Sequence, residues 1–176
     1  LATPAASVIL LRDCPSGLET YLLHRHARMA FAPSMVVFPG GRVDAVDASG
    51  EGDPIRRCAL RETSEETGVV LTATDLYRWA HWITPEIEPR RYDTTFFVTA
   101  MPDDQEAADI SGETDHAAWS TPGDALAAER SGRIRMLPPT LSILIELADL
   151  ATVAEVISRT IERKIEPVLP RLVEAE

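Results

Sequence analysis

The sequence predicts an α+β domain, a three-layer sandwich with helices around a mixed β-sheet. Strand-length apolar stretches dominate the first part of the chain, one well-capped helix interrupts them, and the C-terminal part has helical periodicity. The 176 residues, 45% of them hydrophobic, match the size of one domain with its own core. We therefore expect a single domain over residues 1–176, with a core sandwich at 1–135 and extra C-terminal helices at 138–166.

The first strands are bounded by turn-forming residues. Residues 5–11 and 19–25 are of strand length and flank a polar, Gly-containing turn at 13–17, which predicts an antiparallel hairpin. Residues 35–38 form another short apolar strand, which we expect to end at the Pro-Gly-Gly of residues 39–41.

The middle of the chain alternates between polar and apolar segments. Residues 42–53 are rich in Asp and Gly and predict a loop. Residues 76–83 and 92–100 predict two further strands, and residues 102–115 predict an acidic loop. Residues 117–119 predict a short final strand.

The clearest helix is expected at residues 54–67. Asp53 can accept hydrogen bonds from the free N–H groups at its start, and Pro54 suits the first helical position. Gly68 suits the left-handed position that ends helices. An apolar residue every fourth position gives a modest buried stripe formed by Ile55, Ala59 and Thr63, and Cys58 is expected to be buried beside it.

The C-terminal part predicts a helix from Thr121 to about Ser131, followed by two more helices. Their proposed apolar stripes are out of phase with each other, and Thr152 with Glu155 suggests a capping box between them. The stripes are expected to face the core or a second copy in a homodimer. They comprise Leu141, Leu144, Ile145 and Ala148 in the first helix and Val153, Val156, Ile157, Thr160 and Ile161 in the second.

Composition restricts the partners of this protein. The formal net charge of −11 disfavours binding to nucleic-acid polymers, although bound cations can still attract a small anion. No run of 18 apolar residues is present, so no membrane partner is expected. Two cysteines without a spacing motif, Cys14 and Cys58, are typical of a reducing, cytoplasmic compartment.

Three carboxylates on the predicted helix carry the most chemical information. Glu62, Glu65 and Glu66 lie three and four residues apart and project from one helix face, where they repel each other without a cation. Mg²⁺ and Mn²⁺ prefer such oxygen ligands. Arg61, four residues before Glu65, can hold a carboxylate in place. The alternative is an ordinary solvated acidic surface, because Glu favours helices.

The wider segment resembles the Nudix box, the signature of the Nudix hydrolases. Its pattern is Gly, five residues, Glu, seven residues, and then Arg-Glu-apolar-x-Glu-Glu-x-Gly-apolar. Counting back from Arg61 places Asp53 where the family has Glu, with six extra residues after Gly41, and Asp53 is expected to act mainly as the helix cap. Thr63 replaces an apolar residue. The matching positions are Gly41, Arg61, Glu62, Glu65, Glu66, Gly68 and Val69.

The resemblance implies a Nudix-type α/β/α sandwich and a metal-dependent hydrolysis of a diphosphate linkage. Glu62, Glu65 and Glu66 would bind Mg²⁺ or Mn²⁺, and Glu65, Glu66 and Arg61 would form the catalytic group with a further loop carboxylate. Glu113 is our candidate for that carboxylate. Glu86 and Glu88 are competing candidates for the general base.

The substrate implied is a small nucleoside diphosphate derivative. Arg25 and Arg91 are the candidate phosphate-binding cations, and Gly41 is expected beside the substrate. The lengthened box loop resembles the coenzyme A diphosphatase subgroup, which suggests coenzyme A or acyl-coenzyme A. ADP-ribose, NADH, and a non-catalytic nucleotide-binding regulator remain alternatives. A second coenzyme A signature fits only at Arg25 and not at its other positions, Ala30, Ser34 and Met35.

Overall fold

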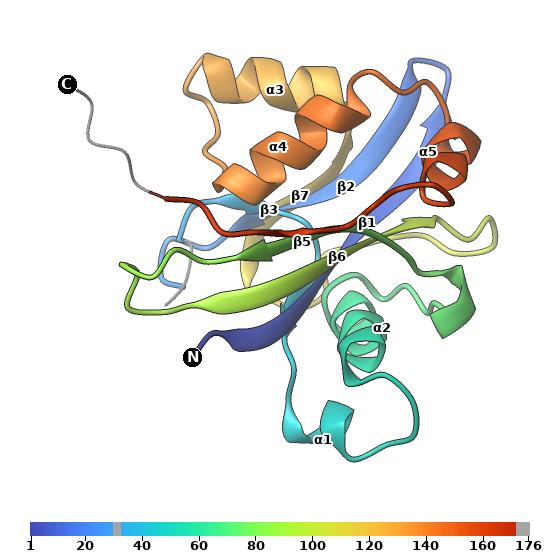
Figure 1. Cartoon of the computed structure of the whole chain (residues 1–176). Coiled ribbons are helices and arrows are strands. Elements are labelled where there is room, and N and C mark those ends of the chain that lie inside the picture. The colour runs from blue at the N-terminus through green and yellow to red at the C-terminus, as the bar shows by residue number, and fades with distance from the viewer. Residues whose placement is uncertain (30–32, 172–176) are drawn as a thin grey trace.

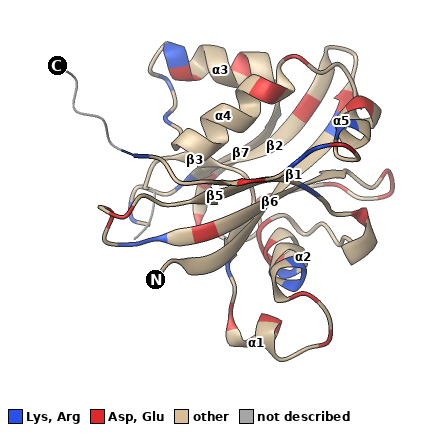
Figure 2. Ribbon diagram, viewed as in Figure 1, with Lys and Arg blue, Asp and Glu red and all other residues tan. Residues whose placement is uncertain are grey.

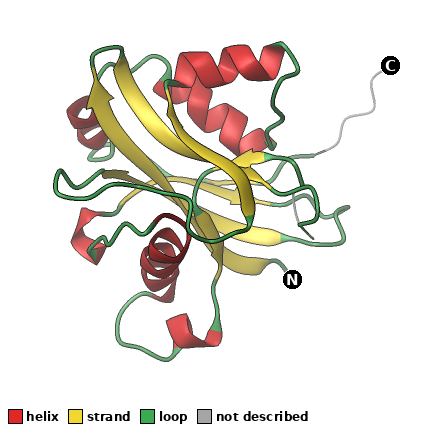
Figure 3. Ribbon diagram, turned by 180° about the vertical axis from the view of Figure 1, so that it is seen from behind, coloured by secondary structure: helices red, strands yellow, loops and turns green. Residues whose placement is uncertain are grey.

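A computed structural model describes residues 1–29 and 33–171, so Ala30 of the partial coenzyme A signature lies outside the described residues. The fold is a three-layer sandwich around a mixed sheet (Figure 1). Helix α2 (Pro54–Thr67) covers one face. Helices α3 (Pro122–Arg130), α4 (Pro138–Leu147) and α5 (Val153–Arg159) cover the other, and the view from behind shows the same layers (Figure 3). The predicted α+β class is confirmed.

The longest strand, β1 (Thr3–Cys14), lies at the centre of the sheet. It pairs in parallel with β6 (Tyr92–Ala100) along one edge. Along its other edge it pairs antiparallel with β2 (Gly17–Arg25) and β4 (Gly40–Arg42). The predicted hairpin is therefore confirmed. The remaining strands are β3 (Val36–Val37), β5 (Tyr77–Ile83), β7 (Thr114–Ser120) and β8 (Pro167–Val168), and the main path runs β3-β2-β1-β6-β5-β8.

Each face of the sheet has its own apolar core. Alternation along β1 sends Ile9 and Leu11 toward the three C-terminal helices and Val8 and Leu10 toward α2. Burial on both faces explains why β1 reads as a continuous apolar run. The core beneath α2 also contains Ala6, Tyr21, Leu23, Cys58, Ala59, Val69, Leu71, Leu76 and Phe97.

Helix α2 begins and ends where the sequence predicts. The Asp53 side chain accepts a hydrogen bond from Ile55 N at 3.0 Å, and Pro54 occupies the first turn. Gly68 ends the helix with a φ of 74°, in the left-handed region. Of the predicted stripe, Ala59 and Thr63 are fully buried, and Ile55 is half-buried against the same core.

Several short elements differ from the prediction. The expected loop at 42–53 contains a one-turn helix, α1 (Ala45–Ala48), and the expected stop at Gly40 and Gly41 is strand β4 instead. A 3₁₀ turn, η1 (Ala73–Asp75), precedes β5, and β7 is longer than predicted. Intrinsic propensity is weak in these stretches. Pairing with β1 or β2 fixes the strands, and α1 and η1 pack against α2.

The two predicted C-terminal helices are both present, but the stripe on α4 is rotated from the prediction. Ile143, Leu144 and Leu147 are buried in the core, whereas Ile145 is 54% exposed. The capping box is incomplete. Thr152 Oγ1 accepts from Glu155 N at 3.2 Å, as predicted, but the Glu155 carboxylate accepts from Ala151 N at 2.9 Å. In the second stripe, Val153 and Val156 are buried, Ile157 and Thr160 are half-buried, and Ile161 is 83% exposed.

Charged residues are distributed over the whole ribbon, with acidic residues in excess (Figure 2). None of the helices within residues 1–29 and 33–171 is long and apolar enough to cross a bilayer. Of the two free cysteines, Cys58 is buried, as predicted, and Cys14 is half-buried.

Candidate active site

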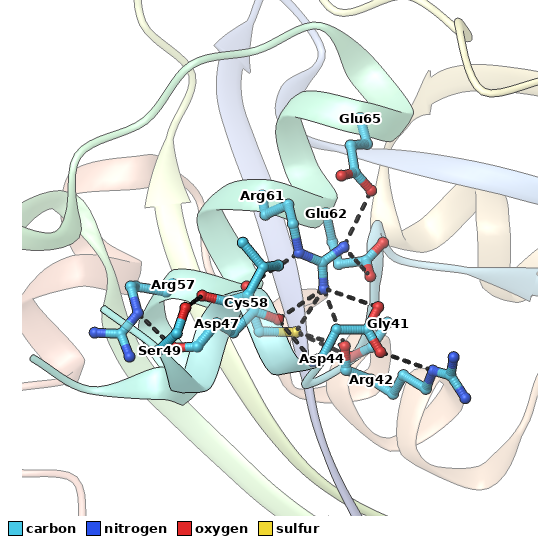
Figure 4. A network of polar contacts seen from close by, with 11 residues as sticks. Gly41, Arg42, Asp44, Asp47, Ser49, Arg57, Cys58, Arg61, Glu62 and Glu65 are labelled. Carbon is cyan, nitrogen blue, oxygen red and sulfur yellow. Dashed lines mark hydrogen bonds and ion pairs between the residues drawn. The ribbon is translucent and has the colours of Figure 1, made fainter. Parts of the chain in front are cut away.

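Two of the three predicted carboxylates, Glu62 and Glu65, flank the guanidinium of Arg61, at the middle of α2 (Figure 4). Arg61 Nη1 donates to Glu62 Oε1 at 2.8 Å and to Glu65 Oε2 at 3.1 Å. The predicted contact between Arg61 and Glu65 is therefore present. One cation thus offsets the repulsion between two neighbouring carboxylates and fixes their direction.

Arg61 is itself held by the segment that follows β4. Its Nε and Nη2 donate to the two carboxylate oxygens of Asp47 at 3.0 and 2.8 Å, and Nη2 also donates to the carbonyl of Arg42 at 3.1 Å. The Asp47 side chain is 3% exposed. The hydrogen bonds from Arg61 lower the pKa of Asp47, and the same pairing raises the pKa of Arg61. This is a buried, bidentate ion pair in which both members stay charged.

Glu66 lies at the buried end of the carboxylate face. It is 7% exposed, and its Oε2 accepts a hydrogen bond from Gly40 N at 3.0 Å. Burial raises the pKa of Glu66 to about 8, and the negative charges of Glu62 and Glu113 add to the increase. Without a bound cation this carboxyl is therefore largely protonated at neutral pH, and a nearby cation would favour its charged form.

Glu62 fills the space above Gly41. A Cβ atom at Gly41 would lie 2.4 Å from Glu62 Oε1, which is too close for two non-bonded atoms. Only a glycine fits at this position without displacing the Glu62 carboxylate. Burial raises the pKa of Glu62, and Arg61 opposes that increase. Glu65, by contrast, has a side chain that is 58% exposed. The three carboxylates thus run from buried Glu66 to solvent-exposed Glu65.

The candidate residues outside α2 divide into two groups. Arg25 is the last residue of β2, and Glu113 immediately precedes β7. The charge of Arg25 lowers the pKa of Glu66 and the charge of Glu113 raises it, so the fold brings both residues to the buried end of the carboxylate face. The carbonyl of Glu113 accepts from His26 N at 3.0 Å, which ties the two strand ends together. Glu86 and Glu88 are exposed in the β5–β6 loop, at the end of the sheet away from α2 in Figures 1 and 3.

Arg91 forms hydrogen bonds with main-chain groups at the ends of β5 and β1. Its Nε donates to the carbonyl of Thr84 at 3.0 Å, and its own carbonyl accepts from Thr3 N at 2.9 Å. Both contacts brace the β5–β6 hairpin against the start of β1. The fold therefore places Arg91 with Glu86 and Glu88, and not with the carboxylates of α2.

Comparison with known families agrees with this geometry. The NUDIX domain model matches residues 2–139, most of the chain. The chain belongs to the Nudix domain family. Members of this family generally use divalent metal ions. The match includes both halves of the site, the glycines of β4 and the carboxylates of α2.

Individual relatives of this Nudix domain are distant. The Caenorhabditis elegans candidate nudix hydrolase 7 is 29% identical over 83% of this chain and 60% of its own length. The acyl-coenzyme A diphosphatase NUDT19 of Xenopus laevis is 22% identical over 86% of this chain and 65% of its own length. This chain thus spans less than two thirds of either relative. The crystal structure of a NUDIX hydrolase from Alicyclobacillus acidocaldarius is 25% identical, with a TM-score of 0.80 over 90% of this chain and 96% of that one.

The structure adds one important residue to this Nudix site, Asp47. Counting back from Arg61 points to Asp53, which caps α2 and forms an ion pair with Arg78 at 3.2 Å. Counting forward five residues from Gly41 points instead to Asp47, which binds Arg61. The extra residues therefore follow Asp47 and do not precede it. The forward spacing in the sequence contained this signal.

Cys58, on the buried side of α2, contacts the main chain of β4. Its Sγ lies 3.3 Å from the carbonyl of Gly41 and 3.2 Å from that of Arg42, within hydrogen-bond distance of both. Burial raises the pKa of the Cys58 thiol to about 12. The thiol thus stays protonated and acts as a small buried donor rather than as a nucleophile.

Two surface hollows lie away from the carboxylates. One of about 360 Å³ lies between the β2–β7 pair and α3 and is lined by Leu22, His24 and Arg133 among others. The other lies between the β5–β6 loop and residues 169–171. Neither hollow is lined by a residue of the Nudix box.

Proposed function

We propose that this chain is a metal-dependent hydrolase that cleaves the diphosphate linkage of a nucleoside diphosphate derivative. The observation that carries this proposal is the Arg61-centred arrangement of Glu62 and Glu65, with Glu66 buried beside it under Gly40. A solvated acidic surface would not bury Glu66 or surround an arginine with three acids. The retained carboxylates also argue against a purely regulatory, non-catalytic module.

The donor set fits Mg²⁺ or Mn²⁺. Among the described residues, no three acidic, imidazole or thiol side chains converge into a complete cage. Proteins usually hold Mg²⁺ with one or two carboxylates together with substrate phosphates and water. Glu62, Glu65 and Glu66 would hold the ions. Once bound, such ions neutralise diphosphate charge and activate the attacking water.

The protein side chains would then perform three tasks. Arg61 would keep Glu62 and Glu65 in position to hold the ions. Glu66 provides a buried carboxylate that becomes charged when a cation approaches. Glu113 is the proposed general base, because its charge acts on Glu66 from a neighbouring strand end, whereas Glu86 and Glu88 lie elsewhere. Arg25, which acts on Glu66 from the adjacent end of β2, is the better candidate for a phosphate contact than Arg91.

Coenzyme A or an acyl-coenzyme A is the proposed substrate. The support is the similarity to a protein named as an acyl-coenzyme A diphosphatase and the lengthened segment between Asp47 and Arg61. A panel of coenzyme A, acyl-coenzyme A, ADP-ribose, NADH and dinucleoside polyphosphates tests it with Mg²⁺ and with Mn²⁺. In ¹⁸O-labelled water, product masses identify both the substrate and the phosphorus attacked. Faster turnover of ADP-ribose or NADH than of coenzyme A would replace this substrate assignment.

A homodimer remains a proposal of its own. The exposed Ile145 on α4 and Ile161 after α5 lie outside the core and could contact a second copy. Light scattering of the purified protein would show a mass of twice the 19.3 kDa chain if they do. A single-chain mass at micromolar concentration would rule this contact out.

A further inference from the structure

The extra segment of the Nudix box is fastened to α2 by a second arginine, Arg57. Asp47 lies in the one-turn helix α1, and the residues between it and Asp53 belong to no strand. Within the segment, the Asp47 carboxylate accepts one hydrogen bond, from Asp44 N at 2.9 Å. A one-turn helix has few hydrogen bonds of its own, so contacts from α2 add to this one in fixing the position of Asp47.

Arg57 supplies one of these contacts. Its Nε donates to the carbonyl of Asp47 at 2.5 Å, and its Nη1 donates to the carbonyl of Glu51. The third nitrogen, Nη2, is buried and has no hydrogen-bond partner within the described residues, so the chain covers that side of the guanidinium. Gly50 permits this wrapping, because a Cβ there would lie 3.2 Å from Arg57 Nε.

The position of Arg57 on the helix is informative. It lies four residues before Arg61, so the two side chains leave the same face of α2 one turn apart. Arg61 binds the side chain of Asp47, and Arg57 binds the main chain of the same residue. Asp47 is therefore held at two points from one rigid helix (Figure 4).

We propose that Arg57 is a positioning residue for the active site. It acts through Asp47, which orients Arg61, which in turn directs Glu62 and Glu65. This inference rests on the proposed function, since it assigns Arg57 to the support of the same metal-holding carboxylates. Arg57 contacts none of these carboxylates in any hydrogen bond or ion pair of the described residues.

A neighbouring arginine provides a matched control. Arg56 Nη1 donates to the carbonyls of Ala73 and Leu76 at 2.9 and 2.7 Å. It thus fastens a different loop to the same helix with the same kind of bond. Replacing either arginine removes two hydrogen bonds to carbonyls, but only Arg57→Ala releases Asp47.

The test compares Arg57→Ala, Arg57→Lys and Arg56→Ala. Mn²⁺ affinity is measured from the electron paramagnetic resonance signal of free Mn²⁺, and turnover is measured with the best substrate of the panel. We expect Arg57→Ala to weaken Mn²⁺ binding and lower kcat about tenfold, as is typical for residues that orient metal ligands. Arg57→Lys should restore part of the loss, because one donor remains, and Arg56→Ala should match wild type in both.

A double substitution separates positioning from general stability. If Arg57 acts through Asp47, adding Arg57→Ala to Asp47→Asn should cause little further loss of kcat. Multiplied losses, or equal losses in Arg56→Ala and Arg57→Ala, would overturn the inference while leaving the proposed function intact. If wild type hydrolyses no substrate but Mn²⁺ binding still responds to Arg57 alone, the function fails and the positioning role stands.

Discussion

Arg61 binds the Asp47 carboxylate through two hydrogen bonds, from Nε to Oδ1 at 3.0 Å and from Nη2 to Oδ2 at 2.8 Å. This pair joins the loop after β4 to the helix that carries the acidic side chains. Because the planar guanidinium reaches Glu62 and Glu65 at the same time, its orientation determines where those carboxylates point. The first prediction concerns this pair.

Arg61→Lys should lower kcat by at least about tenfold, because an ammonium cannot reproduce the fork that spans Asp47 and the two glutamates. Asp47→Asn should have a similar effect. Circular dichroism should show that both variants fold, and Arg12→Lys, a change in an exposed pair with Glu19, is the control. Arg61→Lys with wild-type kcat would contradict the orienting role.

The same pair predicts sensitivity to acid. Pairing lowers the pKa of Asp47 below its ordinary value of 3.8 in the folded protein. Its contribution to stability is therefore complete above that ordinary value and is lost as the pH falls through the lowered pKa. Between pH 5 and pH 2, wild type should lose more stability than Asp47→Asn, which has no such charge to lose. Parallel melting curves for the two proteins over this range would be inconsistent with a lowered pKa.

Glu66 predicts the opposite trend at higher pH. Its folded-state pKa of about 8 lies above the ordinary 4.5, so its contribution is complete below 4.5 and is lost as the pH rises through 8. Metal-free Glu66→Gln should therefore melt at the same temperature as wild type near pH 4 and several degrees higher at pH 9. Mg²⁺ should stabilise wild type at pH 9 and stabilise the variant less. Equal melting temperatures at pH 9 would show that Glu66 is not buried as described.

Gly41 predicts a steric effect on the site. In Gly41→Ala, the new Cβ would approach Glu62 Oε1 to 2.4 Å and force the carboxylate to move. We expect a loss of metal affinity and of kcat, about tenfold or more, in a folded protein. Gly123→Ala, where no atom lies within 4 Å of the added carbon, is the matched control and should behave as wild type. The assignment fails if the two alanine variants are indistinguishable.

The general base can be identified among three glutamates. Glu113→Gln should lower kcat by about a hundredfold or more, in the usual range for a lost general base, and remove one limb of the pH–rate profile. Glu86→Gln and Glu88→Gln should leave both unchanged, because the β5–β6 loop lies away from α2. A loss confined to Glu86→Gln or Glu88→Gln would transfer the role to that loop.

The sequence predicted the long elements well because local chemistry determines them. Capping by Asp53, Pro54 and Gly68 sets both ends of α2, and the turn after β1 sets the hairpin. Strand β4 was not predicted, because a Gly-Gly-Arg stretch has little strand propensity and pairs only where β1 offers an open edge. The stripe on α4 was misplaced because Ile145 and Ile143 look alike in sequence, and only packing decides which is buried.

The site was predicted in part for a similar reason. Spacing along a helix places Glu62, Glu65 and Glu66 on one face, and helix geometry alone determines that result. The partnership of Asp47 with Arg61 and the clamp by Arg57 depend on how a short loop folds back on α2, which periodicity does not encode. The separation of Arg91 from Arg25 likewise depends on strand order.

The most direct test of the central claim is Mg²⁺-dependent release of phosphate-bearing products from the panel by wild type and by Glu66→Gln. Glu162→Gln, which alters an exposed acid after α5, is the control. If the α2 carboxylates hold the ions, wild type and Glu162→Gln should hydrolyse a phosphoanhydride, and Glu66→Gln should be slower by at least about a thousandfold while remaining folded. Equal rates for Glu66→Gln and wild type would contradict the claim.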